Sequence, residues 1–300
     1  MNNELVSVII PSYKRSEMLP RAVKSVLAQT YKNIEIIVVD DNDPDSLWRR
    51  DTEKRMNQFK NNCHVKYICH EKNKNGSVAR NTGIKNASGS IIAFLDDDDE
   101  YLPTKIEKQV SFLLEHPEYK AVYSGWIRAN KKIIPTHQGD LSYDILSGNN
   151  IIYTNVIMMW KKCAEEFGGW DESFIRNQEA AFLLRYFDAG YKIGVVSEAL
   201  VIFDITDRSN VAANSIVNEK QMMQLINNYT KAMNRCETTK KGSRKRIICS
   251  RKKGIFLSYI KDKKYKEATE VLIEMLSDYP VCFCWTMLKY GIKRISGKNY

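Results

Sequence analysis

The sequence of 300 residues contains no apolar run of the roughly 20 residues that a membrane-spanning helix needs. Met1 is followed by Asn2, Asn3 and Glu4 and not by the basic, then apolar pattern of a secretory leader. The seven cysteines include no CxxC pair, and their odd number does not complete a disulfide framework. These absences predict a cytoplasmic protein with reduced thiols.

The sequence also lacks the histidine patterns of metal and nucleophilic sites and the glycine-rich pattern of a phosphate-binding loop. The four histidines show neither an i, i+4 pair nor an HExxH arrangement, so we assign none of them to metal binding or nucleophilic catalysis. No glycine lies in the segment Pro11-Ser12-Tyr13-Lys14-Arg15, although a glycine-rich phosphate loop would be expected there in a nucleotidyltransferase. A nucleotidyltransferase therefore remains only an alternative.

Acidic residues are few in the C-terminal part of the chain. Residues 220–300 hold 19 Lys and Arg against 6 Asp and Glu, whereas residues 1–219 hold 27 against 30. This asymmetry predicts an anionic partner for the C-terminal part, and basic clusters beside apolar side chains are typical of binding to an anionic membrane surface. A helical appendage with a solvated basic face is the alternative. Nucleic acid is not expected, because no recognition motif accompanies the charge.

Strands alternate with helices over the first hundred residues, which predicts an α/β fold with a mainly parallel sheet. Short β-branched and apolar runs indicate strands at residues 6–10, 34–39, 64–69 and 90–95. Helices are expected between them: from Ser16 as N-cap to Gln29 with Pro20 in the first turn, from about Pro44, and over residues 77–86.

The rest of the chain is less regular. We expect helices over residues 103–114 and 178–189, strands over 121–129, 151–160 and 193–203, and C-terminal helices around residues 221–233 and 255–276. Gly168-Gly169-Trp170-Asp171 reads as a turn, and Gly190 as the residue that ends a helix.

Four consecutive aspartates, Asp96 to Asp99, follow the predicted strand at residues 90–95. Like charges packed together repel one another unless a cation neutralises them. Carboxylate oxygens suit Mg²⁺ or Mn²⁺, and Mg²⁺ commonly takes one or two carboxylates while substrate phosphates complete its shell. The alternative is a solvated acidic loop before a helix N-terminus. Ligands of open α/β sheets bind beyond the carboxyl ends of the strands, which is where this run lies.

Five separated segments, in the same order, resemble the family 2 glycosyltransferases. They are Val8-Ile9-Ile10-Pro11-Ser12-Tyr13-Lys14-Arg15, Ser25-Val26-Leu27-Ala28-Gln29-Thr30-Tyr31, Val38-Val39-Asp40-Asp41, Ala79-Arg80-Asn81-Thr82-Gly83-Ile84 and Phe94-Leu95-Asp96-Asp97-Asp98-Asp99. The resemblance covers residues 5 to about 205. It implies the GT-A fold, an inverting mechanism and a bacterial surface-polysaccharide type of enzyme.

The resemblance also implies how the chain is divided. Residues 1–217 would form the GT-A catalytic domain, with a nucleotide-binding half at about 1–100 and an acceptor half at about 101–217. Residues 218–300 would form a basic helical C-terminal region.

Carried over by position, the family's DxD motif falls on Asp96 and Asp98. The resemblance implies that Asp98 binds the Mn²⁺ or Mg²⁺ ion directly, and that Asp96 faces the donor ribose or the metal shell. It further implies that Asp40 receives the N–H of a uracil base and that Arg80 lies near the nucleotide or its diphosphate. The wall and stacking surface of the nucleotide pocket fall on Ser12 and Tyr13, and Pro11 and Arg15 are also expected to bind the nucleotide.

The resemblance places the general base at Glu179, where the family more often has Asp. Glu179 lies beyond the Gly-Gly-Trp-Asp turn and six residues before Arg185. An inverting transfer needs such a carboxylate to take the proton from the acceptor hydroxyl. The alternative is an acidic residue that only favours the helix dipole. Where many relatives have a further histidine ligand, this chain offers Asp204 or Asp207, either of which can instead pair with Arg208.

Together these features predict a metal-dependent hexosyl- or N-acetylhexosaminyltransferase. The donor would be a nucleotide diphosphate sugar, with a UDP-sugar favoured, and the acceptor a saccharide that is free or lipid-linked. The protein would be cytoplasmic, either free or peripheral at the inner face of the cell membrane. The alternative outside enzymes is a catalytically silent GT-A homologue that serves as partner of an active transferase.

Overall fold

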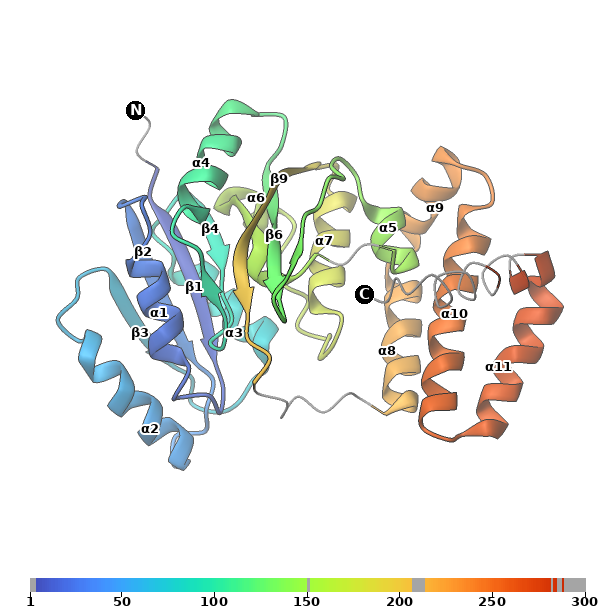
Figure 1. The fold of residues 1–300 in the computed structure, drawn as a ribbon, viewed down its shortest axis with the longest axis horizontal. Helices are drawn as coiled ribbons and strands as arrows, with labels where there is room; N and C mark the ends of the chain where they lie inside the picture. Colours follow the sequence, from blue (N-terminus) through green and yellow to red (C-terminus); the bar gives the residue numbers. More distant parts are fainter. Residues whose placement is uncertain (1–3, 150–151, 207–213, 282, 285–287, 289–300) are drawn as a thin grey trace. The chain divides into compact units, whose positions relative to one another are not determined.

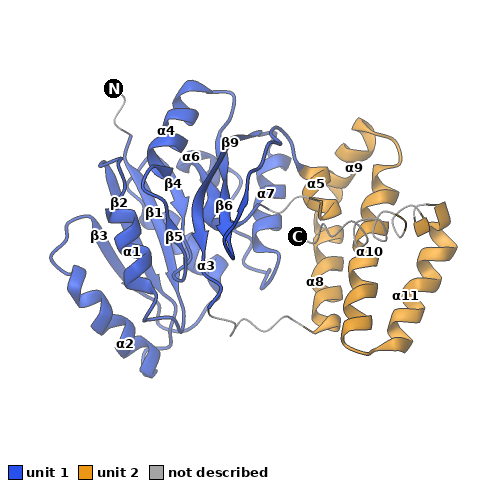
Figure 2. Cartoon of the chain, in the orientation of Figure 1, with its two compact units in different colours: residues 1–141, 152–210 blue, residues 142–151, 211–300 orange. Residues whose placement is uncertain are grey.

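The computed structural model describes residues 4–149, 152–206, 214–281, 283, 284 and 288, which form two compact units. Unit 1 contains residues 1–141 and 152–210, and unit 2 contains residues 142–151 and 211–300 (Figure 2). Thus a short segment from the middle of the chain belongs with the C-terminal helices.

A nine-stranded sheet forms the centre of unit 1, with helices packed on its faces (Figure 1). Its strand order is β3-β2-β1-β4-β8-β6-β9-β5, with β7 paired to β6. The strands are β1 Val6–Ser12, β2 Ile34–Asp40, β3 Val65–Cys69, β4 Ile91–Phe94, β5 Glu100–Tyr101, β6 Ala121–Arg128, β7 Lys131–Ile133, β8 Ile157–Trp160 and β9 Ile193–Phe203.

The pairings confirm a mixed sheet in which the N-terminal half is parallel. β1 pairs in parallel with β2 and β4, and β2 with β3, as the alternation of strands and helices predicted. β8 runs antiparallel to both β4 and β6, and it is shorter than expected because residues 154–156 form a 3-10 turn, η2. The Gly-free apolar runs of β1, β2 and β4 are buried almost throughout, as strands covered on both faces should be.

Most helices of unit 1 fall close to their predicted positions, whereas α6 and the short η1 were not predicted. They are α1 Leu19–Leu27, α2 Leu47–Met56, η1 Asn57–Phe59, α3 Gly76–Asn86, α4 Lys105–Glu115, α6 Lys161–Glu166 and α7 Gln178–Asp188. Pro20 lies in the first turn of α1 as expected, but the prediction of Ser16 as N-cap is wrong. The cap position is Met18, which makes no side-chain capping bond, and Ser16 is buried two residues earlier.

Unit 2 is helical and has its own core. Its helices are α5 Ser142–Ser147, α8 Ser215–Asn228, α9 Thr230–Thr239, α10 Ser243–Lys261 and α11 Tyr265–Asp278. Buried side chains of α10 and α11 form one cluster: Cys249, Ile255, Tyr259, Ala268, Val271 and Met275. In the described part of the chain no helix is both long and apolar enough to span a membrane.

The predicted bounds of the C-terminal helices are wrong in two places. A break at Tyr229 separates α8 from α9, and a turn with Lys263 in the left-handed region (φ 58°) separates α10 from α11. Arg251 explains why α5 belongs to this unit, because its buried guanidinium donates to the carbonyl groups of Ile145 and Leu146. These contacts join segments a hundred residues apart, which local periodicity does not reveal.

Gly83 allows α3 to pack tightly against the central strand β1. A Cβ atom at this position would lie 2.3 Å from Cγ2 of Ile9, a distance that real contacts do not show. Ile9 is fully buried and branched at its own Cβ, so it has little freedom to move away. The glycine in this motif is therefore required by close packing.

We predict that Gly83→Ala destabilises the protein by about 1–3 kcal/mol, because overpacking in a close-packed core outweighs the better helix propensity of alanine. Gly254→Ala in α10 is the matched control, since a Cβ there meets no described atom within 4 Å. The control should be neutral or stabilising by up to about 1 kcal/mol. Urea unfolding followed by circular dichroism measures both changes, and equal effects would contradict the packing argument.

Candidate functional site

Three parallel strands end at one edge of the sheet and bring the predicted site residues together. Ser12 at the end of β1 lies in register with Asp40 at the end of β2. On the other side of β1, Ile9 lies in register with Phe94 at the end of β4, and the aspartate run follows two residues later. The site is therefore assembled wholly within unit 1.

The four aspartates alternate between buried and more exposed positions. Asp97 and Asp99 are 3% and 4% exposed and accept hydrogen bonds from the protein. Asp97 accepts from the hydroxyl of Ser12 (2.8 Å) and the backbone N–H of Tyr13 (3.2 Å). Asp99 accepts from the side-chain amide of Asn155 and from the backbone N–H of Asp204 (2.8 Å). These two carboxylates hold the loop together.

Asp96 and Asp98 are more exposed, and each carboxylate pairs with an arginine side chain. The side chain of Asp96 is 33% exposed and accepts from Nη2 of Arg80 at 2.6 Å. The side chain of Asp98 is 17% exposed and lies 3.0 Å from Nη1 of Arg15. Asn155 also accepts the backbone N–H of Asp96 (2.8 Å), so one asparagine fixes both ends of the run.

Burial and mutual repulsion raise the pKa values of three of these aspartates. Burial is the main cause for each, and neighbouring aspartates add to it, so that the pKa rises to about 7 for Asp97, about 6 for Asp98 and about 8 for Asp99. The guanidinium of Arg15 offsets part of this effect for Asp97 and Asp98. A bound cation would relieve the remaining repulsion.

The donor set at this edge fits a hard divalent cation that shares its shell with a phosphorylated ligand. Asp96 and Asp98 offer carboxylate oxygens, which Mg²⁺ and Mn²⁺ prefer. In the part of the chain that the structure describes, no three His, Cys, Asp or Glu side chains converge to form a complete metal cage. A site with one or two carboxylates suits Mg²⁺ when phosphate oxygens supply further ligands.

Asp204, considered above as an additional ligand, is already engaged. Its carboxylate accepts from the backbone N–H and hydroxyl of Thr206 and from Nη2 of Arg21 (2.7 Å). Although burial raises its pKa, the bonds from Thr206 and Arg21 lower it to about 2. In this geometry Asp204 is an ion-pair partner of Arg21, and three donated hydrogen bonds already occupy most of its acceptor positions. Asp207 lies outside the described residues.

Arg80 connects the aspartate run to the start of α7. Its Nη1 donates to the side-chain oxygen of Gln178 (2.9 Å), and its guanidinium lies over the ring of Trp170 at 4.8 Å. Trp170 is fixed in turn, because its backbone N–H and carbonyl both bond the side chain of Asn81 at 2.9 Å. The Gly-Gly-Trp-Asp turn therefore supports the guanidinium of Arg80, which binds Asp96.

Glu179, the predicted general base, follows Gln178 in the first turn of α7 and is half-buried. Burial raises its pKa, the charge of Arg80 lowers it, and the charge of Asp96 raises it again. Arg80 contacts both Asp96 and Gln178, so the fold brings the start of α7 beside the aspartate run, although the two are more than eighty residues apart in the sequence. A carboxylate with a raised pKa has the basicity that proton abstraction needs.

Asp40 and Asp41 are buried and saturated with protein donors. Asp40 accepts from the backbone and side chain of Asn42 (both 2.8 Å) and from Tyr67, and its other contact is Nε of Arg49 at 3.1 Å. The predicted bond from a base N–H to Asp40 would need one of these donors to leave.

Asp41 anchors the loop that precedes α3. It accepts from His70 (2.7 Å) and from the backbone N–H groups of Lys74 (2.9 Å) and Asn75 (3.0 Å). Asn75 has φ 90° and caps α3, the helix that carries Arg80. Asp41 therefore supports Arg80 through the backbone.

Tyr13 is the exposed member of the segment at the end of β1. It is 40% exposed and flanked by Lys14, whose Nζ lies 4.9 Å from the ring centre. Lys14 has φ 59°, and its N–H donates to Asn42 (2.9 Å). Pro11 and Ser12 lie within β1, and Ser12 is 1% exposed. The ring of Tyr13 thus offers a stacking surface, whereas Ser12 supports Asp97.

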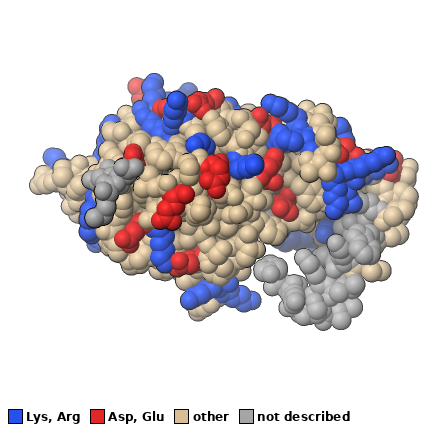
Figure 3. Space-filling view, turned by 90° about the horizontal axis from the view of Figure 1, so that it is seen from above, with Lys and Arg blue, Asp and Glu red and all other residues tan. Residues whose placement is uncertain are grey.

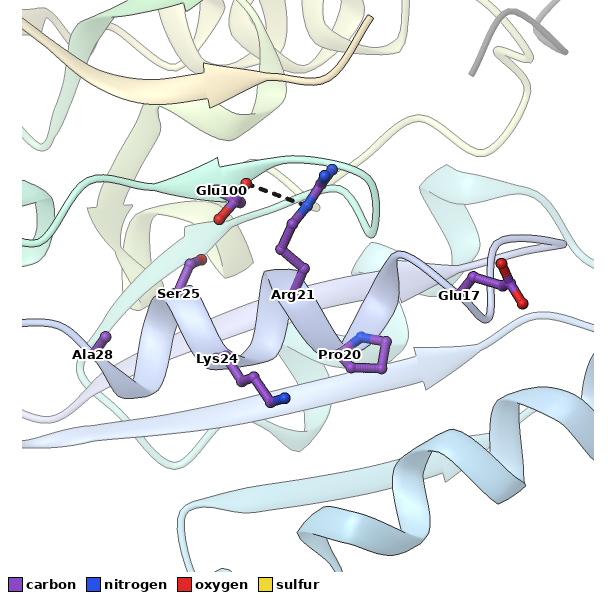
Figure 4. A pocket seen from close by; sticks show the side chains of 7 residues that line it. All are labelled: Glu17, Pro20, Arg21, Lys24, Ser25, Ala28 and Glu100. Carbon is purple, nitrogen blue, oxygen red and sulfur yellow. Dashed lines mark ion pairs between the residues drawn. The ribbon is translucent and has the colours of Figure 1, made fainter. Parts of the chain in front are cut away.

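Sequence reasoning missed Asn155 and Arg21. Asn155 lies in η2 and no motif points to it; only the fold shows that it bonds Asp96 and Asp99. No sequence motif singles out Arg21, which lies in the first turn of α1. Its Nη2 donates to the backbone carbonyl of Asp98 (2.6 Å). On its other side a shallow hollow of about 580 Å³ lies along α1, with Glu100 across from Arg21 (Figure 4).

Residues 7–176, more than half of the chain, match the family described as Glycosyl transferase family 2. The chain belongs to the family 2 glycosyltransferases. Its fold is of the GT-A type: the structure superposes on S. aureus TarS 1–349 in complex with UDP with a TM-score of 0.59 and 16% identity, covering 91% of this chain and 72% of TarS. At this identity the likeness establishes the fold alone.

Several curated relatives are more similar in sequence over shorter segments. The Escherichia coli protein WfgD, named UDP-Glc:alpha-D-GlcNAc-diphosphoundecaprenol beta-1,3-glucosyltransferase, is 39% identical over 116 residues, covering 39% of this chain and 44% of WfgD. TuaG of Bacillus subtilis, named a putative teichuronic acid biosynthesis glycosyltransferase, is 40% identical over 111 residues, covering 37% and 42%. An uncharacterized glycosyltransferase of Rickettsia conorii is 39% identical over 152 residues, covering 50% and 23%. The chain thus spans less than half the length of each of these relatives.

Proposed function

We propose that this protein is a metal-dependent inverting glycosyltransferase that moves a hexosyl or N-acetylhexosaminyl group from a UDP-sugar to a saccharide acceptor. The observation that carries the proposal is the alternation of the aspartate run, which leaves Asp96 and Asp98 outward and arginine-paired while Asp97 and Asp99 are buried. The names of WfgD and TarS's UDP complex support a uridine donor, and WfgD's name supports a lipid-linked saccharide acceptor in surface-polysaccharide synthesis.

In this proposal each residue has a physical role. Asp98, with Asp96 beside it, would hold Mn²⁺ or Mg²⁺, which supplies charge neutralisation for the departing diphosphate. Arg80 and Arg15 orient these carboxylates and add positive charge near the phosphates. Tyr13 offers its ring to the base, and Asp40 shapes the pocket through Asn42 and Tyr67. Glu179 takes the proton from the acceptor hydroxyl.

The donor proposal is tested by calorimetric titration of UDP, GDP and ADP with and without Mn²⁺. We expect UDP to bind most tightly, to need Mn²⁺, and to lose binding in Asp98→Ala, because the diphosphate then lacks the cation that balances its charge. Asp51→Ala, an exposed aspartate of α2, is the matched control and should bind as the wild type does. Undiminished UDP binding in excess EDTA would contradict the metal requirement, and equal affinity for the three nucleotides would remove the basis for a uridine donor.

Glu179→Gln tests the base and separates an active enzyme from a catalytically silent homologue. With the acceptor present, kcat should fall by about 10² to 10⁴, the usual contribution of a positioned acid or base, while UDP affinity stays unchanged. Glu179→Asp should keep partial activity, since a displacement near 1 Å can cost about 10²-fold. Because the base must be deprotonated, the wild-type rate should rise with pH through a pKa above the ordinary value for glutamate.

Glu165→Gln on α6 is the control for loss of an acidic side chain and should leave kcat unchanged. Wild-type kcat in Glu179→Gln would move the role to another carboxylate, with Asp171 and Glu172 in the preceding turn the next to test. Absence of turnover by the wild type with every UDP-sugar, despite Mn²⁺-dependent UDP binding, would favour the silent homologue.

We further propose that unit 2 binds an anionic membrane surface and so holds the protein at the inner face of the cell membrane. Its support is charge: Lys and Arg side chains gather over unit 2 in Figure 3, and Lys240, Lys241, Arg244 and Lys245 are exposed. Arg251 does not contribute, because it is buried against α5. Many apolar side chains of α10 and α11 are likewise used in the core, so electrostatic attraction must dominate the binding.

We predict that replacing Lys240, Lys241 and Lys245 with Gln reduces co-sedimentation with anionic phosphatidylserine vesicles at low salt. Each basic residue near such a surface contributes about 1 kcal/mol, and the effect should weaken as salt rises. The matched control replaces three exposed lysines of unit 1, Lys54, Lys60 and Lys72, with Gln. Absence of wild-type binding to these vesicles, or an equal loss in the control, would favour a basic appendage without a membrane role.

A further inference from the structure

Arg21 joins four segments of unit 1 around the aspartate run. It projects from the first turn of α1, and its Nη2 donates both to the backbone carbonyl of Asp98 (2.6 Å) and to Oδ2 of Asp204 (2.7 Å). Its Nε lies 3.2 Å from Oε1 of Glu100, and Figure 4 shows the two side chains pointing toward each other. From α1, one guanidinium therefore contacts the aspartate loop, β5 and the residue after β9.

The bond to the Asp98 carbonyl acts on the backbone from which the outward carboxylate projects. Arg15 holds the carboxylate itself at 3.0 Å, while Arg21 holds the main chain of the same residue. Mg²⁺ demands near-ideal octahedral geometry at about 2.0–2.1 Å, so small displacements of a ligand weaken its binding. A side chain that fixes the Asp98 backbone thus bears on cation affinity without touching the cation.

Asp204 is the second half of this arrangement. Its backbone N–H donates to Asp99, its carboxylate accepts from Arg21, and Thr206 fixes the carboxylate from the other side. The pair of Arg21 and Asp204 therefore holds Asp98 and Asp99 together: the arginine acts on the carbonyl of the first, and the N–H of Asp204 on the carboxylate of the second. The side chain of Asp204 is only 9% exposed, whereas that of Arg21 is 41% exposed.

We propose that Arg21, fixed by Asp204, is a positioning residue that sets the affinity of the aspartate run for a divalent cation bound with a nucleoside diphosphate. The inference rests on the proposed function, since it deepens the account of the same site. It assigns to α1 a part in cation binding although no residue of α1 is expected to touch the cation, the nucleotide or the acceptor.

The experiment is a Mn²⁺ titration of UDP binding to the full chain, which reports the Mn²⁺ concentration at half-maximal binding. Arg21→Met should raise this midpoint by about 10- to 100-fold, the usual effect of removing a residue that orients a metal ligand. Arg21→Lys should recover part of the loss, because it keeps the charge but not the planar fork that reaches two acceptors at once. Asp204→Asn should shift the midpoint in the same direction by less, since the Asp98 carbonyl keeps its donor.

Lys24→Met is the matched control on the same helix. Lys24 is exposed and lines the same hollow, but Figure 4 shows it pointing away from Arg21 and Glu100. Its Mn²⁺ midpoint should equal that of the wild type. Melting temperatures without metal accompany every titration, because a purely structural role would lower the melting temperature and leave the midpoint of the folded protein unchanged.

The outcomes separate the two proposals. If the wild type binds no UDP in Mn²⁺, the proposed function fails at the donor. If the wild type binds but folded Arg21→Met has an unchanged midpoint, the proposed function stands and the role of Arg21 is overturned. Should Arg21→Met not fold, the same decision falls to Arg21→Lys and Asp204→Asn, and unchanged midpoints in both would overturn the inference.

Discussion

The site depends on one electrostatic constraint: four carboxylates follow one another at the end of β4 and must be kept apart or balanced. At an effective dielectric constant near 20, two unit charges 4 Å apart interact with about 4 kcal/mol, so the run is costly without compensation. The protein supplies it from three directions. Arg15, which follows β1, pairs with Asp98, Arg80 on α3 pairs with Asp96, and hydroxyl, backbone and amide donors satisfy the buried pair.

This compensation divides the run into two functional halves. Asp97 and Asp99 are buried and accept from hydroxyl, backbone and amide donors, with Arg15 also 3.5 Å from Asp97, so they fix the loop. The outward Asp96 and Asp98 pair with arginines that leave part of each carboxylate open to a ligand. Asn155 links the two halves, because its side chain accepts a hydrogen bond from the backbone N–H of Asp96 and donates one to the carboxylate of Asp99. The geometry of the outward pair is therefore set by the inward pair.

Local sequence patterns were enough to predict most strands and helices of unit 1 and the segments that meet at the sheet edge, but not the short strands β5 and β7. Ser12, Asp40 and the aspartate run follow apolar strands, and parallel strands bring their ends together. The patterns could not show that Asp40 is saturated by Asn42 and Tyr67, since these bonds depend on the packing of β3 and the loop after β2. Ser16 failed as an N-cap because its own side chain is buried and the helix begins only at Leu19, with Met18 at the cap position.

The family match ends at residue 176, yet the site extends beyond it. Gln178 and Glu179 begin α7, and Asp204 follows β9, so the proposed general base and the carboxylate partner of Arg21 come from sequence outside the matched segment. Arg80 binds Asp96 through one nitrogen and Gln178 through the other. Its guanidinium therefore lies between Asp96 and the first turn of α7, which contains Glu179. A displacement of the start of α7 would therefore move the partner of Asp96 as well, so the donor and acceptor sides proposed for the site are coupled through one guanidinium.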